Sequence, residues 1–446
     1  MRGTQAVPSV RRGKGLLPLA GLIIVAGAAG TVSAPAADFQ VTLGGQYRIN
    51  AYAADNDIAG EETQSAARLR LRQSLDLAFD DHFKTHLQVE LGHTTDNLAT
   101  TGSSTRANRL EVRHAVLEYT FGNGIDAQAG IVPLGDRFQD TLFSSDWNYN
   151  PLALALTFPV GKGKLRAFAG KLSEGSETAA KDDFSHYQVD YVIPFGEGSR
   201  ISLGGTALVM GSNGTTRDLG PTAITTGIHY NYALGGTFVV GRWTLNGLAL
   251  GSRTQGRLLG TKDDGSGFAA KLELTGRAGA GSFGLLGTWA LGASDGTGFQ
   301  APLAFTPAVG KGANSYWGYT GILTVQGPTD TGFDGDSLNI SNNGYGLASV
   351  QAKWASRAYG PLRGYVAAGW FGGSRAAGRS RSVGAEVMAI GTYRFGKALA
   401  FDAGAGYARL DDSVSGYHQG AAGAFNQPPG AKRGKRALFA RLQAEF

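Results

Sequence analysis

The sequence predicts an all-β fold, a transmembrane antiparallel β-barrel of about 18 strands whose two termini lie at the same end. Three observations predict it: a two-residue alternation of apolar and polar side chains through residues 37–446, connections that alternate between short and long, and a leader-like N-terminus. The 446 residues contain no cysteine, which excludes disulfide scaffolds, thiolate metal sites and iron–sulfur centres. No apolar run reaches the ~20 residues of a membrane helix, so a helical membrane protein is excluded as well.

The first 36 residues are predicted to be a secretory signal peptide. Basic residues at Arg11–Lys14 precede the apolar stretch Leu16–Ala29, and a tail of small residues ends at Ala36. A membrane anchor helix is the alternative, but this apolar stretch is shorter than the ~20 residues of a span. Without the four basic residues of this segment, 41 − 4 = 37 basic residues face 35 acidic ones. That balance of +2 does not indicate a nucleic-acid partner.

Residues 37–446 are predicted to form the barrel domain. In Phe83–Leu91 and Tyr187–Phe195, for example, apolar residues alternate with polar ones, which gives each strand one apolar and one polar face. The predicted strands are 39–53, 64–80, 82–96, 107–122, 124–134, 151–160, 163–175, 184–195, 199–212, 225–240, 242–255, 265–279, 282–293, 343–355, 361–373, 382–396, 398–411 and 435–446.

The connections between these strands set the architecture. Short turns rich in Gly, Asn and Asp, such as Gly122–Gly124 and Gly196–Gly198, alternate with long connections, and the series begins and ends with a long one. This pattern places both termini at the short-turn end of a membrane barrel. A soluble β-sandwich or propeller would also alternate. The barrel is preferred because aromatic residues such as Trp243 and Tyr393 gather at strand ends, as in interfacial girdles, and because closure removes every strand edge.

Several stretches resemble a known family. Arg68–Arg72, Ala115–Phe121, Ala129–Phe138 and the C-terminal Leu442–Phe446 are similar to segments of Gram-negative outer-membrane porins, and most similar to the alginate-export type of 18-stranded barrel. The specific motifs cover residues 64–150 only. The resemblance implies the outer membrane of a Gram-negative bacterium, periplasmic termini, and contact with outer-membrane lipid. It also implies that the barrel-assembly machinery recognises Phe446.

The polar faces carry more basic than acidic residues. The predicted pore-lining residues are Arg48, Arg68, Arg70, Arg72, Glu90, Arg109, Glu111, Arg113, Glu118, Arg166, Arg277, Arg363 and Arg394. Antiparallel pairing should bring Arg48 level with Arg68 and Arg70, and Arg72 level with Glu90. Two interpretations stay open: an anion-attracting wall of guanidinium groups, or a structural ladder of Arg–Glu pairs without electrical consequence.

The third long connection, residues 135–150, is a candidate constriction loop. Its candidate residues combine charge with aromatic surface and are Asp136, Arg137, Phe138, Asp140, Asp146 and Trp147. The loop either folds into the pore or lies on the surface, and the sequence does not choose between them. The connection 294–342 is long enough to act as a lid or a partner surface.

The predicted function is a channel for passive diffusion of small polar or anionic solutes. Export of an acidic polysaccharide is the specific version that the resemblance implies. The alternative is a barrel shell or gated conduit for a partner complex, such as a cytochrome or export machinery. The solute, the direction of transport and the oligomeric state are open.

No catalytic residue, metal or cofactor is expected. A barrel enzyme is disfavoured because His114, His186 and His229 lack partners at convincing spacing. His82 and His86 share a strand face, but four strand residues put them ~13 Å apart, too far for one metal ion. Gly279–Gly284 matches a dinucleotide-binding motif by letter only, since no helix follows it.

Overall fold

The computed structural model contains an eighteen-stranded antiparallel β-barrel, which confirms the predicted fold class. It describes residues 39–54, 64–96, 109–138, 141–143, 145, 149–173, 184–210, 227–256, 265–293, 297–301, 318–324, 346–374, 382–411 and 434–446. The predicted signal peptide lies outside these residues. The strands are β1 (Gln40–Ala54), β2 (Gln64–Ala78), β3 (Phe83–Asp96), β4 (Arg109–Thr120), β5 (Asp126–Ile131), β6 (Leu152–Val160), β7 (Gly163–Ser173), β8 (Phe184–Pro194), β9 (Arg200–Met210), β10 (Gly227–Val240), β11 (Trp243–Gly256), β12 (Gly265–Ala278), β13 (Gly281–Ala290), β14 (Ala348–Ser356), β15 (Leu362–Gly372), β16 (Ser382–Arg394), β17 (Leu399–Leu410) and β18 (Gly434–Glu445).

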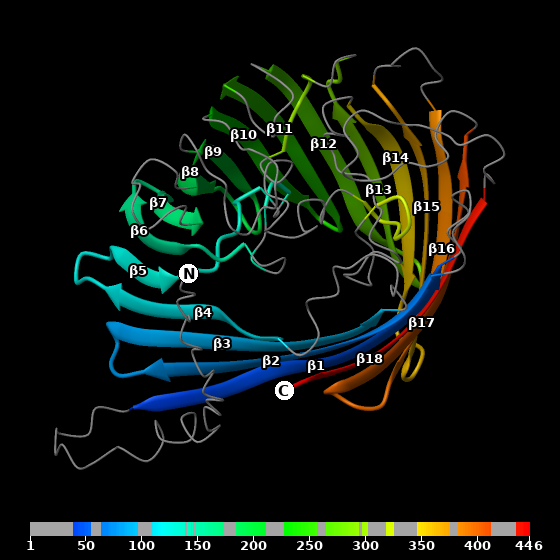
Figure 1. Cartoon of the computed structure of the whole chain (residues 1–446), viewed down its shortest axis with the longest axis horizontal. Coiled ribbons are helices and arrows are strands. Elements are labelled where there is room, and N and C mark those ends of the chain that lie inside the picture. Colours follow the sequence, from blue (N-terminus) through cyan, green and yellow to red (C-terminus); the bar gives the residue numbers. More distant parts are fainter. Residues whose placement is uncertain are drawn as a thin grey trace, which may run out of the picture. The chain divides into compact units, whose positions relative to one another are not determined.

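The barrel closes between its first and last strands, because β1 pairs with both β2 and β18 (Figure 1). The seam continues to the last residue: the Phe446 N–H donates to Gly45 O at 3.2 Å, and the Gly45 N–H donates to Phe446 O at 2.8 Å. A side chain does not fit at Gly45, since a Cβ there would lie 2.5 Å from Arg72 O and 2.9 Å from the Phe446 ring. Every strand therefore has two hydrogen-bonded neighbours, as a chain in lipid requires.

The tight turns gather at one end of the barrel, where β1 begins and β18 ends. Gly161 and Gly241 occupy two of these turns with φ of 56° and 59°, in the left-handed region that glycine enters without steric cost. Within the described ranges, no helix is long and apolar enough to cross a membrane.

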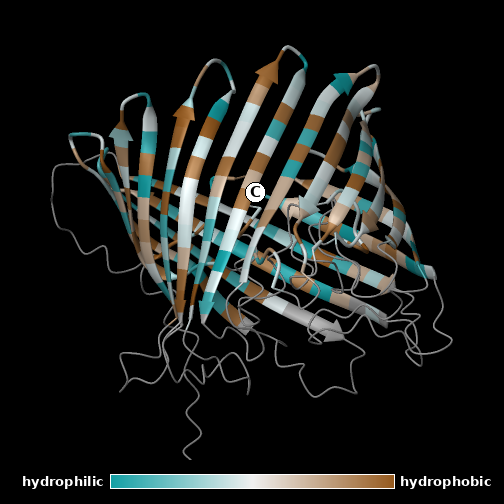
Figure 2. Ribbon diagram, turned by 90° about the horizontal axis from the view of Figure 1, so that it is seen from above, coloured by the Kyte–Doolittle hydropathy of each residue, from teal (hydrophilic) through white to brown (hydrophobic). Residues whose placement is uncertain are grey.

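The outer face is apolar and the inner face is largely polar, the reverse of a soluble domain. On β12, Leu272 points outward and is 57% exposed, whereas the neighbouring Lys271 points inward and is 6% exposed. The same contrast on β14 separates Val350, 66% exposed, from Ser349, 3% exposed. The alternation of apolar and polar residues is visible along the strands in Figure 2.

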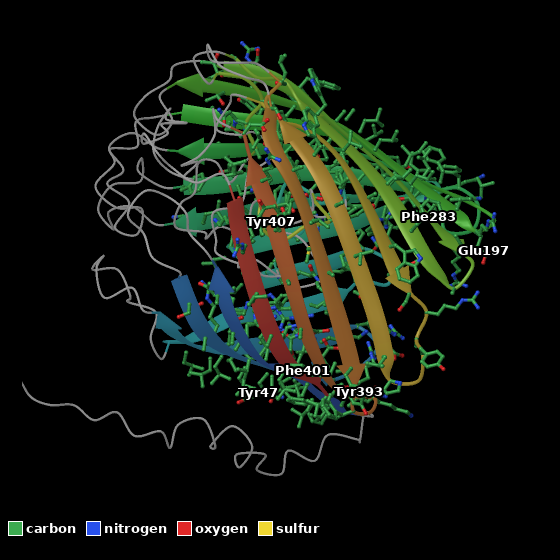
Figure 3. The ribbon with its side chains drawn as sticks, turned by 90° about the vertical axis from the view of Figure 1, so that its right-hand side faces the viewer. Tyr47, Glu197, Phe283, Tyr393, Phe401 and Tyr407 are labelled. Carbon is green, nitrogen blue, oxygen red and sulfur yellow. The ribbon has the colours of Figure 1, made fainter. Side chains whose placement is uncertain are left out.

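Aromatic side chains project from the outer face near the barrel ends. In Figure 3, Tyr47, Tyr393 and Phe401 lie near the short-turn end, and Tyr407 lies further along the wall towards the other end. All four are between 37% and 42% exposed. This distribution is typical of aromatic belts at the two interfaces of a bilayer.

A β-bulge on β4 changes which side chains face inward. Gln88 of β3 pairs with His114 and Val89 pairs with Val112, so Arg113 is the extra residue. As a result, Arg113 and His114 both point inward, with 3% and 7% of their surface exposed.

Candidate functional site

Positive charge is concentrated on the described inner faces of β18, β1 and β2, which we call the basic wall. Its members share the inward face in the strand register, and they are Arg48, Arg68, Arg70, Arg72 and Arg441. Arg48 and Arg70 stand directly opposite each other across β1 and β2, as the sequence predicts. Like charges at this position repel, so the wall projects a positive potential into the lumen.

The arginines of the basic wall contact both carboxylates and neutral oxygens. Arg72 and Arg441 bind carboxylates: Arg72 Nε lies 2.6 Å from Glu90 Oε2, and Arg441 Nε lies 2.8 Å from Asp402 Oδ2. The other three donate to neutral oxygens: Arg48 to Gln443 at 2.7 Å, Arg68 to the Tyr52 hydroxyl at 3.1 Å, and Arg70 to Gln46. Carboxylate pairs of the predicted ladder are therefore present in the basic wall, and Arg48, Arg68 and Arg70 bind neutral oxygens there as well.

The other predicted pore-lining residues occupy the inner face outside the basic wall. Glu111 stands opposite Glu90, Glu118 accepts a hydrogen bond from Gln128, and Arg166 lies 3.0 Å from Asp190. The predicted residues near the short-turn rim face inward by register and are exposed, and they are Arg277, Arg363 and Arg394. Only the backbone of Arg109 is described, and it pairs with Gly92.

The described residues between β5 and β6, within 132–151, lie inside the barrel, and we call them the first inner segment. The Gly135 carbonyl accepts a hydrogen bond from Arg166 at 2.8 Å, and the Ser145 carbonyl accepts one from Arg113 at 2.5 Å. The Tyr149 hydroxyl lies 3.1 Å from His186 Nδ1. Of the candidate constriction residues, Asp136, Arg137 and Phe138 lie in this segment; Asp140, Asp146 and Trp147 are outside the described residues.

Asp136 organises the first inner segment. Its carboxylate accepts backbone N–H groups from Phe138 at 2.8 Å, Leu142 at 2.5 Å and Phe143 at 3.2 Å. Burial raises the pKa of Asp136 to about 6, although these three donors favour the ionised form. On its flank, Arg137 Nε lies 3.4 Å from Asp190 on β8. One side chain therefore holds the turn that brings Arg137 and Phe138 against the wall.

A second piece of chain, Gly318–Thr324, also lies inside the barrel, and we call it the second inner segment. The Glu386 carboxylate on β16 accepts the N–H groups of Gly321, Ile322 and Leu323 at 2.8, 2.7 and 2.6 Å. The Tyr319 hydroxyl donates to Glu273 on β12 at 2.5 Å. The sequence does not predict a specific role for the connection 294–342, which contains this segment. In Figure 1 the coloured parts of both inner segments lie within the ring of strands.

We expect Glu386→Gln to release the second inner segment without opening the barrel. In the glutamine, an NH2 group replaces one carboxylate oxygen and cannot accept a hydrogen bond from the backbone N–H that it faces. A buried hydrogen bond lost in this way costs about 1–3 kcal/mol. Hydrogen exchange read by mass spectrometry should therefore be about 10- to 100-fold faster at Gly321–Leu323, since each 1.4 kcal/mol is a factor of ten. Glu445→Gln, at the end of β18, is the control. Unchanged exchange at Gly321–Leu323 would contradict this role of Glu386.

Several inward positions of β7, β9 and β11 are apolar, which alternation did not predict. Phe168, Leu208 and Leu250 point inward from β7, β9 and β11 and are no more than 4% exposed. Phe143 of the segment stacks on Tyr149, with ring centroids 5.2 Å apart, and both are buried. Large apolar residues at inward positions of these strands were the available sequence signal. The rings of Phe143, Tyr149 and Phe168 all pack on His186 of β8, and these contacts join the first inner segment to the barrel wall.

A closed antiparallel barrel with an apolar outer face and chain folded into its interior is the architecture of outer-membrane porins. Solved structures agree. Pseudomonas aeruginosa OccK9 (OpdG) is 13% identical, with 91% of this chain and 99% of that chain covered and a TM-score of 0.55. OccK2 (OpdF) from the same organism, solved in complex with glucuronate, is 12% identical over 91% and 98% of the two chains, with a TM-score of 0.53. OpdK, solved with vanillate, is 12% identical over 91% and 98%, with a TM-score of 0.51.

No family model and no curated protein matches the sequence. The likeness to Pseudomonas outer-membrane porins confirms the resemblance predicted from sequence at the level of the fold. It does not single out the alginate-export type.

Proposed function

We propose that the chain is an outer-membrane channel through which small anionic solutes diffuse passively. The observation that carries the proposal is the basic wall, where Arg48 and Arg70 face each other inside a barrel that two inner segments narrow. Guanidinium groups stay charged and bind carboxylates with two parallel hydrogen bonds. Glucuronate and vanillate, named with two of the similar porins, are carboxylates. The solute class proposed here is therefore small organic acids.

In the proposed cellular arrangement, residues 1–36 direct export and residues 37–446 form the barrel in the outer membrane of a Gram-negative bacterium. The short-turn end faces the periplasm, and the opposite end of the barrel faces the cell exterior. The apolar face contacts outer-membrane lipid, and Phe446, hydrogen-bonded to Gly45, is the element read by the barrel-assembly machinery.

Single-channel recording in a planar bilayer under a tenfold salt gradient tests the proposal. We expect steady conductance with an anion-selective reversal potential, and block by millimolar glucuronate added to one side. A barrel that is folded, as judged by a change of its gel migration on heating, and yet carries no current would contradict the open channel. That outcome would favour the barrel shell or gated conduit for a partner complex.

Export of an acidic polysaccharide is the second candidate, supported by the motif resemblance over residues 64–150. A polyuronate carries the same carboxylates as glucuronate along an extended chain, so the same basic wall suits it. Long-lived block by polyuronate, with little effect of the monomer, would favour polymer export. Block by the monomer alone would favour small solutes.

The proposed membrane location predicts the effect of Leu272→Arg. Leu272 lies mid-strand on the outer face, and an arginine facing lipid near the bilayer centre costs about 2–4 kcal/mol. Urea titration of the barrel folded into lipid vesicles should show a loss of this size. Tyr359→Arg, at a turn position that is 87% exposed, is the control and should change stability little. Equal stability of the two variants would contradict a lipid-facing β12.

A further inference from the structure

Two histidines from neighbouring strands face each other on the inner wall. His86 Nε2 of β3 lies 3.2 Å from His114 Nδ1 of β4, and the ring centroids are 5.3 Å apart. The bulge at Arg113 creates this pair, because it turns His114 inward beside a strand on which His86 already faces the lumen. The pair considered from sequence, His82 and His86, lies along one strand and does not converge in this way.

The outer contacts of the two rings set their tautomers. His86 Nδ1 lies 2.6 Å from Asp76 Oδ1, and a carboxylate only accepts, so Nδ1 carries the proton and Nε2 presents a lone pair. His114 Nε2 lies 3.1 Å from Asn150 Oδ1. With the Asn150 amide in this orientation its oxygen accepts, so Nε2 carries the proton and Nδ1 presents a lone pair. With these two tautomers, the 3.2 Å contact between His86 Nε2 and His114 Nδ1 is a hydrogen bond only when one added proton lies between the two nitrogens, and that is the place a metal ion can take instead.

We propose that His86 Nε2 and His114 Nδ1 bind one divalent transition-metal ion such as Zn²⁺ or Cu²⁺. Imidazole nitrogens are preferred ligands of both ions, and with Zn–N bonds of about 2.0–2.1 Å two nitrogens 3.2 Å apart subtend about 100° at the metal, close to the tetrahedral angle. Asp76 and Asn150 hold the opposite ring nitrogens, the arrangement that orients metal-binding histidines and raises their basicity. Within the described residues, no cluster of three or more His, Asp or Glu side chains is arranged to hold a metal, so water supplies the other ligands.

The surroundings of the pair admit a cation. The side chains of His86 and Asp76 are 30% and 52% exposed, so an ion reaches them from the lumen. Two arginines lie close by, and both share Glu90: Arg72 Nε at 2.6 Å and Arg113 Nε at 3.4 Å from Oε2. Asp76 adds a second negative charge directly behind His86. The positive charge near the pair is thus countered by two carboxylates.

Metal binding at this pair would also act on the first inner segment. Asn150 belongs to that segment, and a metal on Nδ1 of His114 withdraws electron density from the ring and strengthens donation from Nε2–H to Asn150 Oδ1. The bound ion would therefore tie the end of the segment to β4. Metal binding at this site can be measured without transport. Failure to bind a metal would therefore leave the proposed channel function untouched.

Calorimetry with Zn²⁺ and electron paramagnetic resonance with Cu²⁺, on the purified barrel without an affinity tag, test the proposal. We expect saturable binding of one ion and nitrogen coupling from two imidazoles. His114→Gln and, independently, His86→Gln should abolish it, and Asp76→Asn should weaken binding by about 10- to 100-fold. His82→Gln is the matched control: this histidine lies in an exposed turn, with Nδ1 2.8 Å from Thr120 O, and its loss should leave binding unchanged.

Each variant must first show the unheated gel shift of a folded barrel. Absence of saturable binding in the unmodified protein would overturn the site and leave a proton shared between the two rings as the explanation of their approach. Equal affinity in the unmodified protein and in folded His86→Gln or His114→Gln would overturn it too.

Discussion

Replacing Arg48, Arg68 and Arg70 together by glutamine is expected to abolish the anion selectivity of the channel. These three side chains face the lumen and donate to the neutral oxygens of Gln443, Tyr52 and Gln46. Their removal takes three positive charges from one wall and leaves the carboxylates of the interior in place. In a tenfold salt gradient an ideally selective pore develops about 59 mV. We expect the unmodified channel to show tens of millivolts of anionic sign, and the triple variant to fall to zero or reverse.

The rim offers a matched control with the same change in charge. Arg277, Arg363 and Arg394 also face inward but lie exposed at the short-turn end, where salt screens charges beyond about 8–10 Å. Their replacement by glutamine should reduce the reversal potential only slightly. If instead the rim variant loses selectivity and the basic-wall variant keeps it, the basic wall is not the selectivity filter and its arginines are structural.

Asp136→Ala is expected to release the first inner segment and raise the single-channel conductance. The substitution leaves the N–H groups of Phe138, Leu142 and Phe143 without their acceptor. Each buried donor left unsatisfied costs about 1–3 kcal/mol, so even 3 kcal/mol in total shifts the balance between docked and released segment by about two orders of magnitude. The recordings should show a larger and noisier open level. The barrel itself should stay folded, because Asp136 takes no part in the hydrogen bonds between the strands or in the seam between Phe446 and Gly45.

Asp81→Ala is the control for this variant, since Asp81 is an exposed residue of the β2–β3 turn. Its conductance should match that of the unmodified channel. Limited proteolysis gives an independent reading: the released segment should be cut in Asp136→Ala and protected in Asp81→Ala. A variant with unchanged conductance and unchanged protection would show that the apolar contacts of Phe143 and Tyr149 hold the segment without Asp136.

The strand count, the two faces of each strand and the shared end of the termini were predictable because they depend on local patterns. Alternation with a period of two assigns each side chain to a face, and a tight turn fixes the register of the two strands that it joins. Arg72 level with Glu90 across the turn at residues 79–82 is such a case, and the structure places their side chains 2.6 Å apart. Arg48 opposite Arg70 follows from the same reasoning across a longer connection.

The interior of the barrel was decided by contacts between residues far apart in the chain. Glu386 and Gly321 are separated by 65 positions, and no periodic pattern links them. The bulge at Arg113 adds one residue to β4 alone, so both it and His114 face the lumen, and the approach of His86 to His114 follows from it. Alternation describes a strand as a repeat, and a single-residue insertion or a loop that packs across the lumen has no repeat to reveal it. Local sequence thus determines the wall of this barrel, whereas three-dimensional packing determines what occupies its interior.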